Sequence, residues 1–305
     1  MSRLRNLVAF LLLAGLWGLS FPAITVGLES LPPLLFAAVR YDVAGVLLLA
    51  YLAARGFEWR PRSREDVLAI GIAGAFLIAG GSLLFVGQRT VPSGIASILY
   101  GLIPILTTGF AAALLPAEPI APRRIAGVVL GFLGVGVIAR PDPANLLTAE
   151  LVGIGFVVAA AVSIALGSVL LRSRRPTLGT APMTAWAMLL GALLLHAGSV
   201  AVGEPTADIA FSTTAVASIL YLGVFASALA YAIYFRLLDL YGPLEINLVS
   251  YVVPLFATAG GVALLGETVT LPMVVGFVLI AGGFVVLKAR TLREELWNAA
   301  RYGRG

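Results

Sequence analysis

The sequence predicts an all-α membrane protein with ten transmembrane helices, arranged as two inverted five-helix repeats. Three observations lead to this fold class: an apolar composition, a series of apolar runs each long enough to cross a bilayer, and two similar segments 150 residues apart. Of the 305 residues, 60% are hydrophobic and 11% are charged, with a mean hydropathy of +1.02. Soluble domains are about half apolar and about a quarter charged, so lipid must cover most of this surface.

The apolar runs define the expected spans. A membrane helix needs roughly 20 mostly apolar residues. The run from Leu7 to about Leu28 exceeds the apolar region of a secretory signal, so it predicts a retained first helix. The connections are short and leave no room for a separate soluble domain. The ten predicted spans are 6–28, 33–54, 67–88, 94–115, 123–140, 150–171, 181–202, 214–237, 244–265 and 272–289.

The distribution of basic residues predicts the orientation. The chain has 20 Lys and Arg residues in total. With a cytoplasmic N-terminus, all of them fall on the inner side except Arg89 and Arg140, which lie outside, and Arg40, which lies within a span. Cytoplasmic loops carry such an excess of basic residues. The sequence therefore predicts a multi-pass protein of the cell membrane with both termini cytoplasmic. The polar tail 291–305 is expected at the cytoplasmic surface.

An internal repeat divides the chain into residues 1–140 and 150–290. Pro104 and Thr108 recur 150 residues later as Pro254 and Thr258, and the tripeptide at 113–115 recurs at 263–265. Each half contains five predicted spans, and an odd number inverts the second half relative to the first. Inverted repeats around a site near the midplane are a recurrent plan of secondary transporters.

These motifs also resemble a known family. The relevant residues are the segment Trp17 to Phe21, Arg40, and two related patterns: Pro104, Leu114, Leu115, Glu118 and Gly127 in the first half, and Pro254, Leu264, Leu265, Gly266, Glu267, Gly276 and Gly283 in the second. Over residues 7–289 the chain resembles the drug/metabolite transporter superfamily, specifically the EamA-type ten-helix permeases. It departs from the family pattern at 115–118, where Gly-Glu is usual, and at Ser163, where Trp is frequent.

The resemblance implies a transporter of small metabolites, amino acids or drugs, usually directed outward. It also implies that spans one, three, four, six, eight and nine surround a central cavity, with five and ten peripheral. Polar side chains in a bilayer turn towards other helices or water. The expected substrate-binding residues are Trp17, Phe21, Tyr100, Tyr231, Tyr234, Asn247 and Tyr251. Ordinary helix packing and interhelical hydrogen bonds are the alternative roles for all of them.

A second group of residues is expected to act as gates or structural elements: Arg40, Pro104, Pro254, Glu118 and Glu267. Arg40 lies more than two turns into its span, where a charge costs at least about 2.5–3.5 kcal/mol on insertion scales. We expect an ion pair or an outward turn towards the headgroups, with binding of an anionic substrate group as the alternative. The two prolines are expected to kink their helices, and the two glutamates to brace the helices that follow them.

The composition excludes several other functions. There is no cysteine and a single histidine, His196, so disulfides, thiol catalysis and histidine-rich metal sites are excluded. His196 is expected in a helix–helix contact, and Glu245 at the start of span nine. No phosphate-binding loop or nucleic-acid motif occurs, and no cofactor is expected.

The predicted function is a secondary transporter, not an enzyme. It would move a small amphipathic metabolite, such as an amino acid or another compound that is neutral overall, by alternating access through a central cavity. The expected partners are the small-molecule substrate and the lipid bilayer, and a homodimer is compatible with the sequence. The alternatives are an intramembrane lipid-acting enzyme and a structural membrane protein.

Overall fold

The structure of the protein, a computed structural model, describes residues 3–114, 122–140, 147–205, 212–247 and 249–302. Every regular element in this part of the chain is helical. The elements are α1 (Arg3–Gly18), α2 (Ser20–Leu28), α3 (Pro33–Ala54), α4 (Arg64–Ile72), η1 (Ala73–Ala79), η2 (Gly80–Ser82), α5 (Leu83–Gly87), α6 (Ser93–Tyr100), α7 (Ile103–Leu114), α8 (Pro122–Ala139), α9 (Ala149–Arg172), α10 (Thr180–Ala201), α11 (Thr213–Leu220), η3 (Tyr221–Leu229), α12 (Ala230–Asn247), α13 (Val249–Leu265) and α14 (Leu271–Tyr302).

Seven stretches of helix within the described residues are long and apolar enough to cross a membrane. Three shorter apolar helices, Ile125–Ala139, Val249–Leu265 and Leu271–Val286, lie beside them. The protein is therefore an all-α, multi-pass membrane protein. The stretches begin and end close to the predicted spans, because charged and Pro- or Gly-containing segments interrupt the apolar runs.

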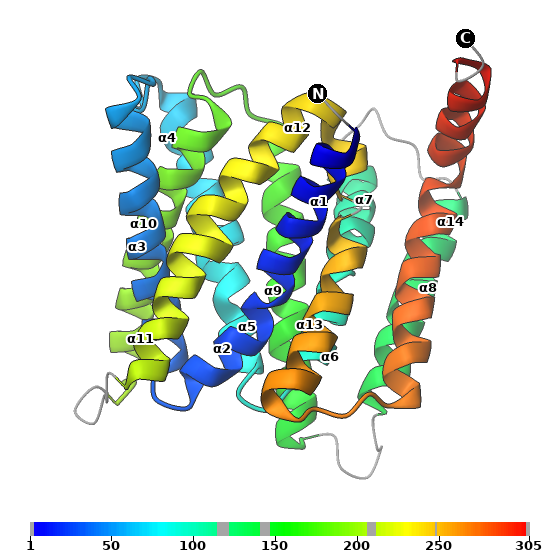
Figure 1. The fold of residues 1–305 in the computed structure, drawn as a ribbon, viewed down its shortest axis with the longest axis horizontal. Helices are drawn as coiled ribbons and strands as arrows, with labels where there is room; N and C mark the ends of the chain where they lie inside the picture. The colour runs from blue at the N-terminus through cyan, green and yellow to red at the C-terminus, as the bar shows by residue number, and fades with distance from the viewer. Residues whose placement is uncertain (1–2, 115–121, 141–146, 206–211, 248, 303–305) are drawn as a thin grey trace.

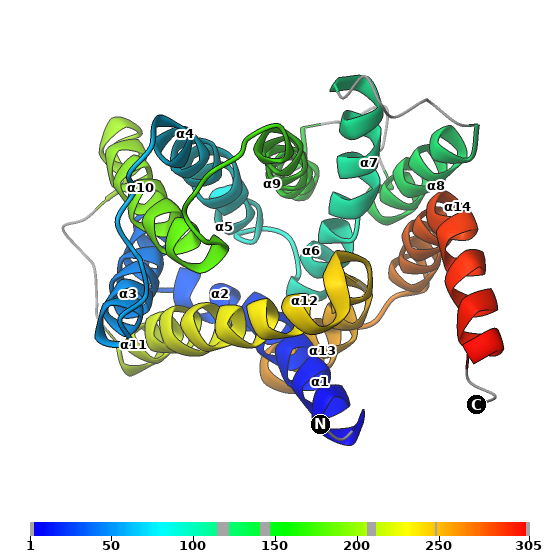
Figure 2. The same ribbon diagram turned by 90° about the horizontal axis from the view of Figure 1, so that it is seen from above.

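The helices run side by side from one end of the bundle to the other (Figure 1). α1 begins and α14 ends at the same end. Seen from above, the pair α3 and α10 lies at one side of the bundle and the pair α8 and α14 at the other, with the remaining helices between them (Figure 2). The elements α11, η3 and α12 follow one another as a single oblique path across the bundle.

Several spans are interrupted inside the predicted membrane segment. α6 ends at Tyr100 and α7 begins at Ile103, so Pro104 occupies the first turn of a new helix. Proline has no N–H to bond the carbonyl four residues earlier, and here the helix stops rather than bending. Pro254, in contrast, lies inside α13. Two segments, η1 and η3, adopt the wider π-helical turn.

One predicted boundary is wrong. An interruption was expected between residues 238 and 243, but α12 continues to Asn247. Glu245 and Asn247 therefore lie in the last turns of α12 and not at the start of the next span. Residues 238–243 combine apolar residues with an aspartate, a glycine and a proline, so their hydropathy predicts a loop although the backbone remains helical.

Glycines bring α8 and α14 into close contact. A Cβ atom on Gly134 would lie 2.8 Å from the carbonyl oxygen of Gly276, and one on Gly283 would lie 2.6 Å from that of Gly127. Small residues at such positions let two helix backbones approach each other in a membrane. The four glycines therefore form the contact between α8 and α14, and we call them the glycine seam.

Acidic side chains cap helices that are remote in sequence. α3 follows Pro32 and α6 follows Pro92, and neither proline offers a side-chain cap. Glu204 instead accepts hydrogen bonds from the amides of Leu34 and Leu35, at 2.9 and 3.0 Å. Glu267 accepts from the amides of Ser93 and Gly94, at 2.7 and 3.2 Å, and from the Ser93 hydroxyl at 3.0 Å. Free amides at a helix start need such partners, so each carboxylate fixes the end of a distant span.

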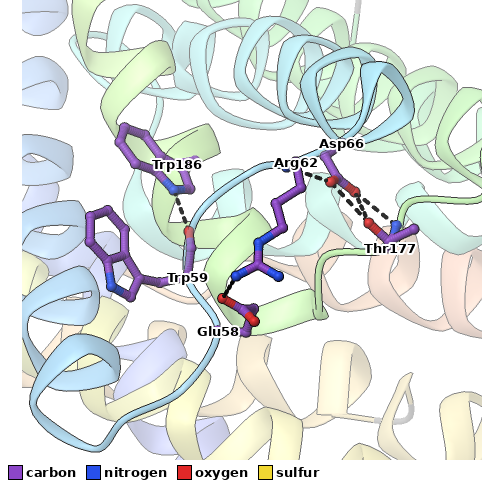
Figure 3. Close-up of polar contacts among 6 residues, drawn as sticks. All are labelled: Glu58, Trp59, Arg62, Asp66, Thr177 and Trp186. Carbon is purple, nitrogen blue, oxygen red and sulfur yellow. Dashed lines mark hydrogen bonds and ion pairs between the residues drawn. The ribbon is translucent and has the colours of Figure 1, made fainter.

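At the opposite end of the bundle, Asp66 joins two links between helices (Figure 3). Its carboxylate accepts from the amide of Arg62 at 3.0 Å and from the amide of Thr177 at 2.7 Å. Close by, the indole of Trp186 donates to the carbonyl of Trp59 at 2.8 Å, and the two indole rings stack. These contacts tie the α3–α4 link to the α9–α10 link and to α10.

Candidate substrate cavity

A cavity of about 440 Å³ lies in the middle of the bundle. Residues of α1, α2, α3, α6, α7, α9, α10, α12 and α13 line it, together with residues of η1, η2 and α5. α8 and α14 contribute none of the described lining residues, as expected for spans five and ten. α3 and α10 do contribute, which the resemblance did not imply.

Aromatic side chains form much of the cavity wall. Trp17 lies 5.8 Å from Tyr231 and 5.4 Å from Tyr234, measured between ring centroids, and Phe21 lies 5.7 Å from Tyr100 in an edge-to-face contact. Five of the residues expected at the site thus meet in one cavity. The aromatic lining residues are Trp17, Phe21, Tyr41, Phe85, Tyr100, Tyr231 and Tyr234.

The polar ends of two of these rings bind the backbone of neighbouring helices. The indole of Trp17 donates to the carbonyl of Ala226 at 3.2 Å, and the hydroxyl of Tyr100 donates to the carbonyl of Gly81 at 2.8 Å. Ala226 lies in η3, and Gly81 lies in η2, directly after η1. Turns of this kind disturb the regular helical pairing and are frequent at functional sites. The irregular turns therefore hold the aromatic wall in position.

Arg40 is the one charged residue among the lining side chains that the structure describes. Its side chain is 9% exposed and points inward, so the expected turn towards the headgroups is wrong. The guanidinium lies 4.7 Å above the ring of Tyr41 and 5.7 Å from that of Phe85, and its Nε and one Nη each lie 3.4 Å from the hydroxyl oxygen of Ser227. Aromatic faces and a hydroxyl thus stabilise the cation instead of lipid phosphates.

Two expected site residues do not join this group. Tyr251 packs its ring against Phe284 of α14, with centroids 4.6 Å apart, and is absent from the cavity wall. The expectation that it faces the cavity with Trp17 is therefore wrong, because its position on α13 directs the ring towards α14. Its hydroxyl is buried and has no hydrogen-bond partner among the described residues. Glu118 and the side chain of Asn247 lie outside the part of the chain that the structure describes.

The remaining structural candidates have clear positions. Glu267 caps α6 and not the helix that follows it, because the start of α6 lies beside the α13–α14 link. His196 meets Asp42 of α3 at 2.7 Å, so the expected helix–helix contact is present. Pro104 is the second residue of α7, and Pro254 lies within α13.

Sequence reasoning missed other residues of structural importance. Ser63 and Asp66 form a capping box at the start of α4, and this three-residue spacing is a recognised local signal of a helix start. Glu204 gave no such signal, because the amides that it binds lie about 170 residues earlier in the chain. Tyr41, next to Arg40, was also overlooked as a cavity residue.

Apolar helices of membrane-spanning length packed around a central cavity are the architecture of a polytopic membrane protein. The sequence model of the EamA-like transporter family matches residues 5–140 and again residues 151–288. The chain therefore belongs to the EamA-like transporter family and is a membrane transporter, as its motifs predicted.

Individual relatives agree with this assignment. The chain is 30% identical over 260 residues to the uncharacterized inner membrane transporter YedA of Escherichia coli K12, covering 84% of this chain and 81% of that protein. It is 29% identical over 298 residues to a probable amino-acid metabolite efflux pump of Salmonella typhimurium, covering 94% and 95% of the two chains. A solved crystal structure superposes with a TM-score of 0.64 over 96% of this chain, at 23% identity, and shares its fold.

Proposed function

We propose that the protein is a secondary transporter that moves a small amphipathic metabolite across the cytoplasmic membrane by alternating access through the central cavity. The observation that carries this proposal is the cavity itself. It has a volume of about 440 Å³ and an aromatic and aliphatic wall with a few hydroxyl groups and a single cation. A mostly apolar cavity of this volume with a few placed polar groups is typical of small-molecule sites.

Ten spans in two inverted halves would provide the two alternating openings. The glycine seam supports this arrangement. Gly127 and Gly134 correspond to Gly276 and Gly283 in the sequence repeat. The pairing is crossed, since Gly127 meets Gly283 and Gly134 meets Gly276. Crossed pairing of equivalent residues is the pattern of a two-fold axis perpendicular to both helices. For membrane-spanning helices such an axis lies in the membrane plane.

The π-helical turns also support the repeat. Phe76 in η1 and Ala226 in η3 are 150 residues apart, which is the offset of the sequence repeat. The carbonyl of Phe76 accepts a hydrogen bond from Ser163 of α9 at 2.9 Å, and that of Ala226 accepts from Trp17 of α1 at 3.2 Å. Each half thus places a π turn in its third span and bonds it to the first span of the other half.

The cavity wall supports an inward-facing state. Its lining residues reach Leu171 at the end of α9 and Thr180 at the start of α10, next to the basic residues of the α9–α10 link. Basic residues concentrate on the cytoplasmic side, so both termini would be cytoplasmic and the cavity would be reached from the cytoplasm. A cavity loaded from this side fits export, and the relatives named as efflux pumps favour the same direction.

Transport in proteoliposomes tests the proposal. Purified protein is reconstituted and counterflow of radiolabelled leucine and of a mixture of amino-acid metabolites is measured. We expect Tyr234→Leu to reduce counterflow severalfold, because it removes an aromatic wall of the cavity. Tyr51→Leu is the matched control, since Tyr51 lies on α3 with its ring exposed on the outer surface. Equal activity of the two variants for a transported compound would exclude the cavity as the transport route.

Orientation has its own test. Because the chain contains no cysteine, single cysteines can be introduced without background labelling. Arg60→Cys is expected to react with an impermeant maleimide in inside-out vesicles, and Arg89→Cys in right-side-out vesicles. The reverse result would overturn the proposed topology. An intramembrane lipid-acting enzyme would instead show product formation from lipid without counterflow.

A further inference from the structure

The charge of Arg40 is unusual for its surroundings. It occupies the eighth position of the 22-residue helix α3, within a predicted membrane span. Charged side chains at this depth are costly and normally pair with an opposite charge. The described side chains around the cavity include no aspartate or glutamate. Asp42, the acidic residue nearest to Arg40 in the sequence, binds His196 instead.

The guanidinium also keeps hydrogen-bonding capacity in reserve. An arginine carries five N–H donors, and among the described residues only the hydroxyl of Ser227 accepts from Arg40, through two long contacts of 3.4 Å. The rings of Tyr41 and Phe85 lie near the guanidinium. Contact with ring faces leaves the in-plane N–H edge of a guanidinium available for a planar acceptor.

We propose that the counter-ion of Arg40 is the carboxylate of the transported substrate. This inference rests on the proposed function and names the substrate class: a small monocarboxylate whose apolar part lies against Trp17, Tyr231 and the neighbouring aliphatic side chains. A carboxylate matches a guanidinium with two parallel hydrogen bonds. A single cation suits a single negative charge, whereas a phosphate dianion would leave charge uncompensated.

The described cavity wall contains no acidic group to bind an ammonium ion. The substrate's amino group, where it has one, is therefore dispensable for recognition. The same site would accept an α-amino acid and the corresponding carboxylic acid, and it would reject the corresponding amine. This preference for the two carboxylates over the amine distinguishes recognition by Arg40 from recognition of an ammonium ion by the aromatic rings alone.

Three compounds with the same isobutyl group test this order on the full-length wild-type protein: leucine, 4-methylpentanoate and 3-methylbutylamine. Binding is measured by thermal shift of the purified protein and by equilibrium binding, with sodium chloride and sodium phosphate at equal ionic strength as controls. We expect leucine and 4-methylpentanoate to stabilise the protein and the amine and both salts to have no effect. Stabilisation by the amine or by phosphate equal to that by the acid would overturn the inference. So would the absence of any shift with either carboxylate at saturating concentration.

Arg40→Gln should weaken binding of 4-methylpentanoate on the order of 10- to 100-fold, as expected for loss of a hydrogen bond to a charged group. Arg40→Lys should retain part of the affinity, because it keeps the charge but not the planar fork. Arg89→Gln is the matched control, because Arg89 lies outside the cavity wall. Size-exclusion profiles establish whether each variant folds. If Arg40→Gln does not fold, the comparison of the three compounds on the wild-type protein tests the inference by itself.

Counterflow separates this inference from the proposed function. Carboxylate-selective binding without counterflow of any carboxylate would overturn transport and leave the role of Arg40 standing. Counterflow of leucine that 3-methylbutylamine inhibits and 4-methylpentanoate does not would support transport and overturn the role of Arg40.

Discussion

A single methyl group added to Gly283 should separate α8 from α14. The ideal Cβ position at Gly283 lies 2.6 Å from the carbonyl oxygen of Gly127, and ordinary contact begins at 3.4 Å. The shortfall is 3.4 minus 2.6, or 0.8 Å, and a backbone atom cannot rotate out of the way. The neighbouring Gly282 has nothing within 4 Å of the same ideal position. Two adjacent residues of one helix thus form a matched pair.

Comparing Gly283→Ala with Gly282→Ala isolates the packing term. The gain in helix propensity, about 0.5–1 kcal/mol, is common to both substitutions and cancels in the difference. What remains is the cost of overpacking, about 1–3 kcal/mol. We therefore expect Gly282→Ala to be neutral or stabilising and Gly283→Ala to be less stable than it by this amount. At roughly 2–3 °C per kcal/mol for a chain of this size, the apparent melting temperatures should differ by about 2–9 °C.

The assay is thermal unfolding of the purified variants in detergent, followed by size-exclusion chromatography at one heating rate. A second pair repeats the test on α8: Gly134→Ala, whose Cβ would meet the backbone of Gly276 at 2.8 Å, and Gly136→Ala, which has open space. Equal melting temperatures within both pairs would refute the close approach of α8 and α14.

Other substitutions test the caps and the isolated hydroxyl. Glu267→Ala should destabilise the protein by about 2–4 kcal/mol, because it leaves two amides at the start of α6 without an acceptor. The control is Glu58→Ala, which removes an exposed ion pair and should change stability by less than about 1 kcal/mol in the same thermal assay. Tyr251→Phe should leave both melting temperature and counterflow unchanged, and a marked loss of stability would show that its hydroxyl has a partner. His196→Ala should lower the yield of folded protein, because it leaves the carboxylate of Asp42 without its partner within the membrane. His196→Gln should retain more of the folded yield. Equal yields for the two variants would show that the contact between His196 and Asp42 does not stabilise the protein.

The positions of the spans follow from sequence because hydropathy changes sharply at their ends. The ends of α3 and α9 lie within a residue or two of the predicted spans 33–54 and 150–171. The interruptions inside spans do not follow, because a π turn and an α turn have the same apolar composition. The helical course of α12 beyond residue 237 was missed for a related reason: hydropathy marks where lipid ends and not where a helix ends.

The cavity residues were predicted where one helix face carried several aromatic or polar groups. Trp17 and Phe21 share such a face, and both line the cavity. Tyr251 shows the limit of this reasoning, since its orientation depends on where α14 packs. The inward direction of Arg40 could not be read from the sequence either, because the rings and the hydroxyl that stabilise it come from three separate elements.

The capping of first-half helices by second-half carboxylates has a consequence for biosynthesis. Leu34 and Ser93 leave the ribosome about 170 residues before the glutamates that cap their helices. At a synthesis rate of roughly 5–20 residues per second, these helix ends wait about 10–30 s for their acceptors. During that interval the amides depend on water, lipid headgroups or the insertion machinery. The first half is thus inserted early but completed late, and a chain truncated before residue 204 would lack the acceptors for both helix starts.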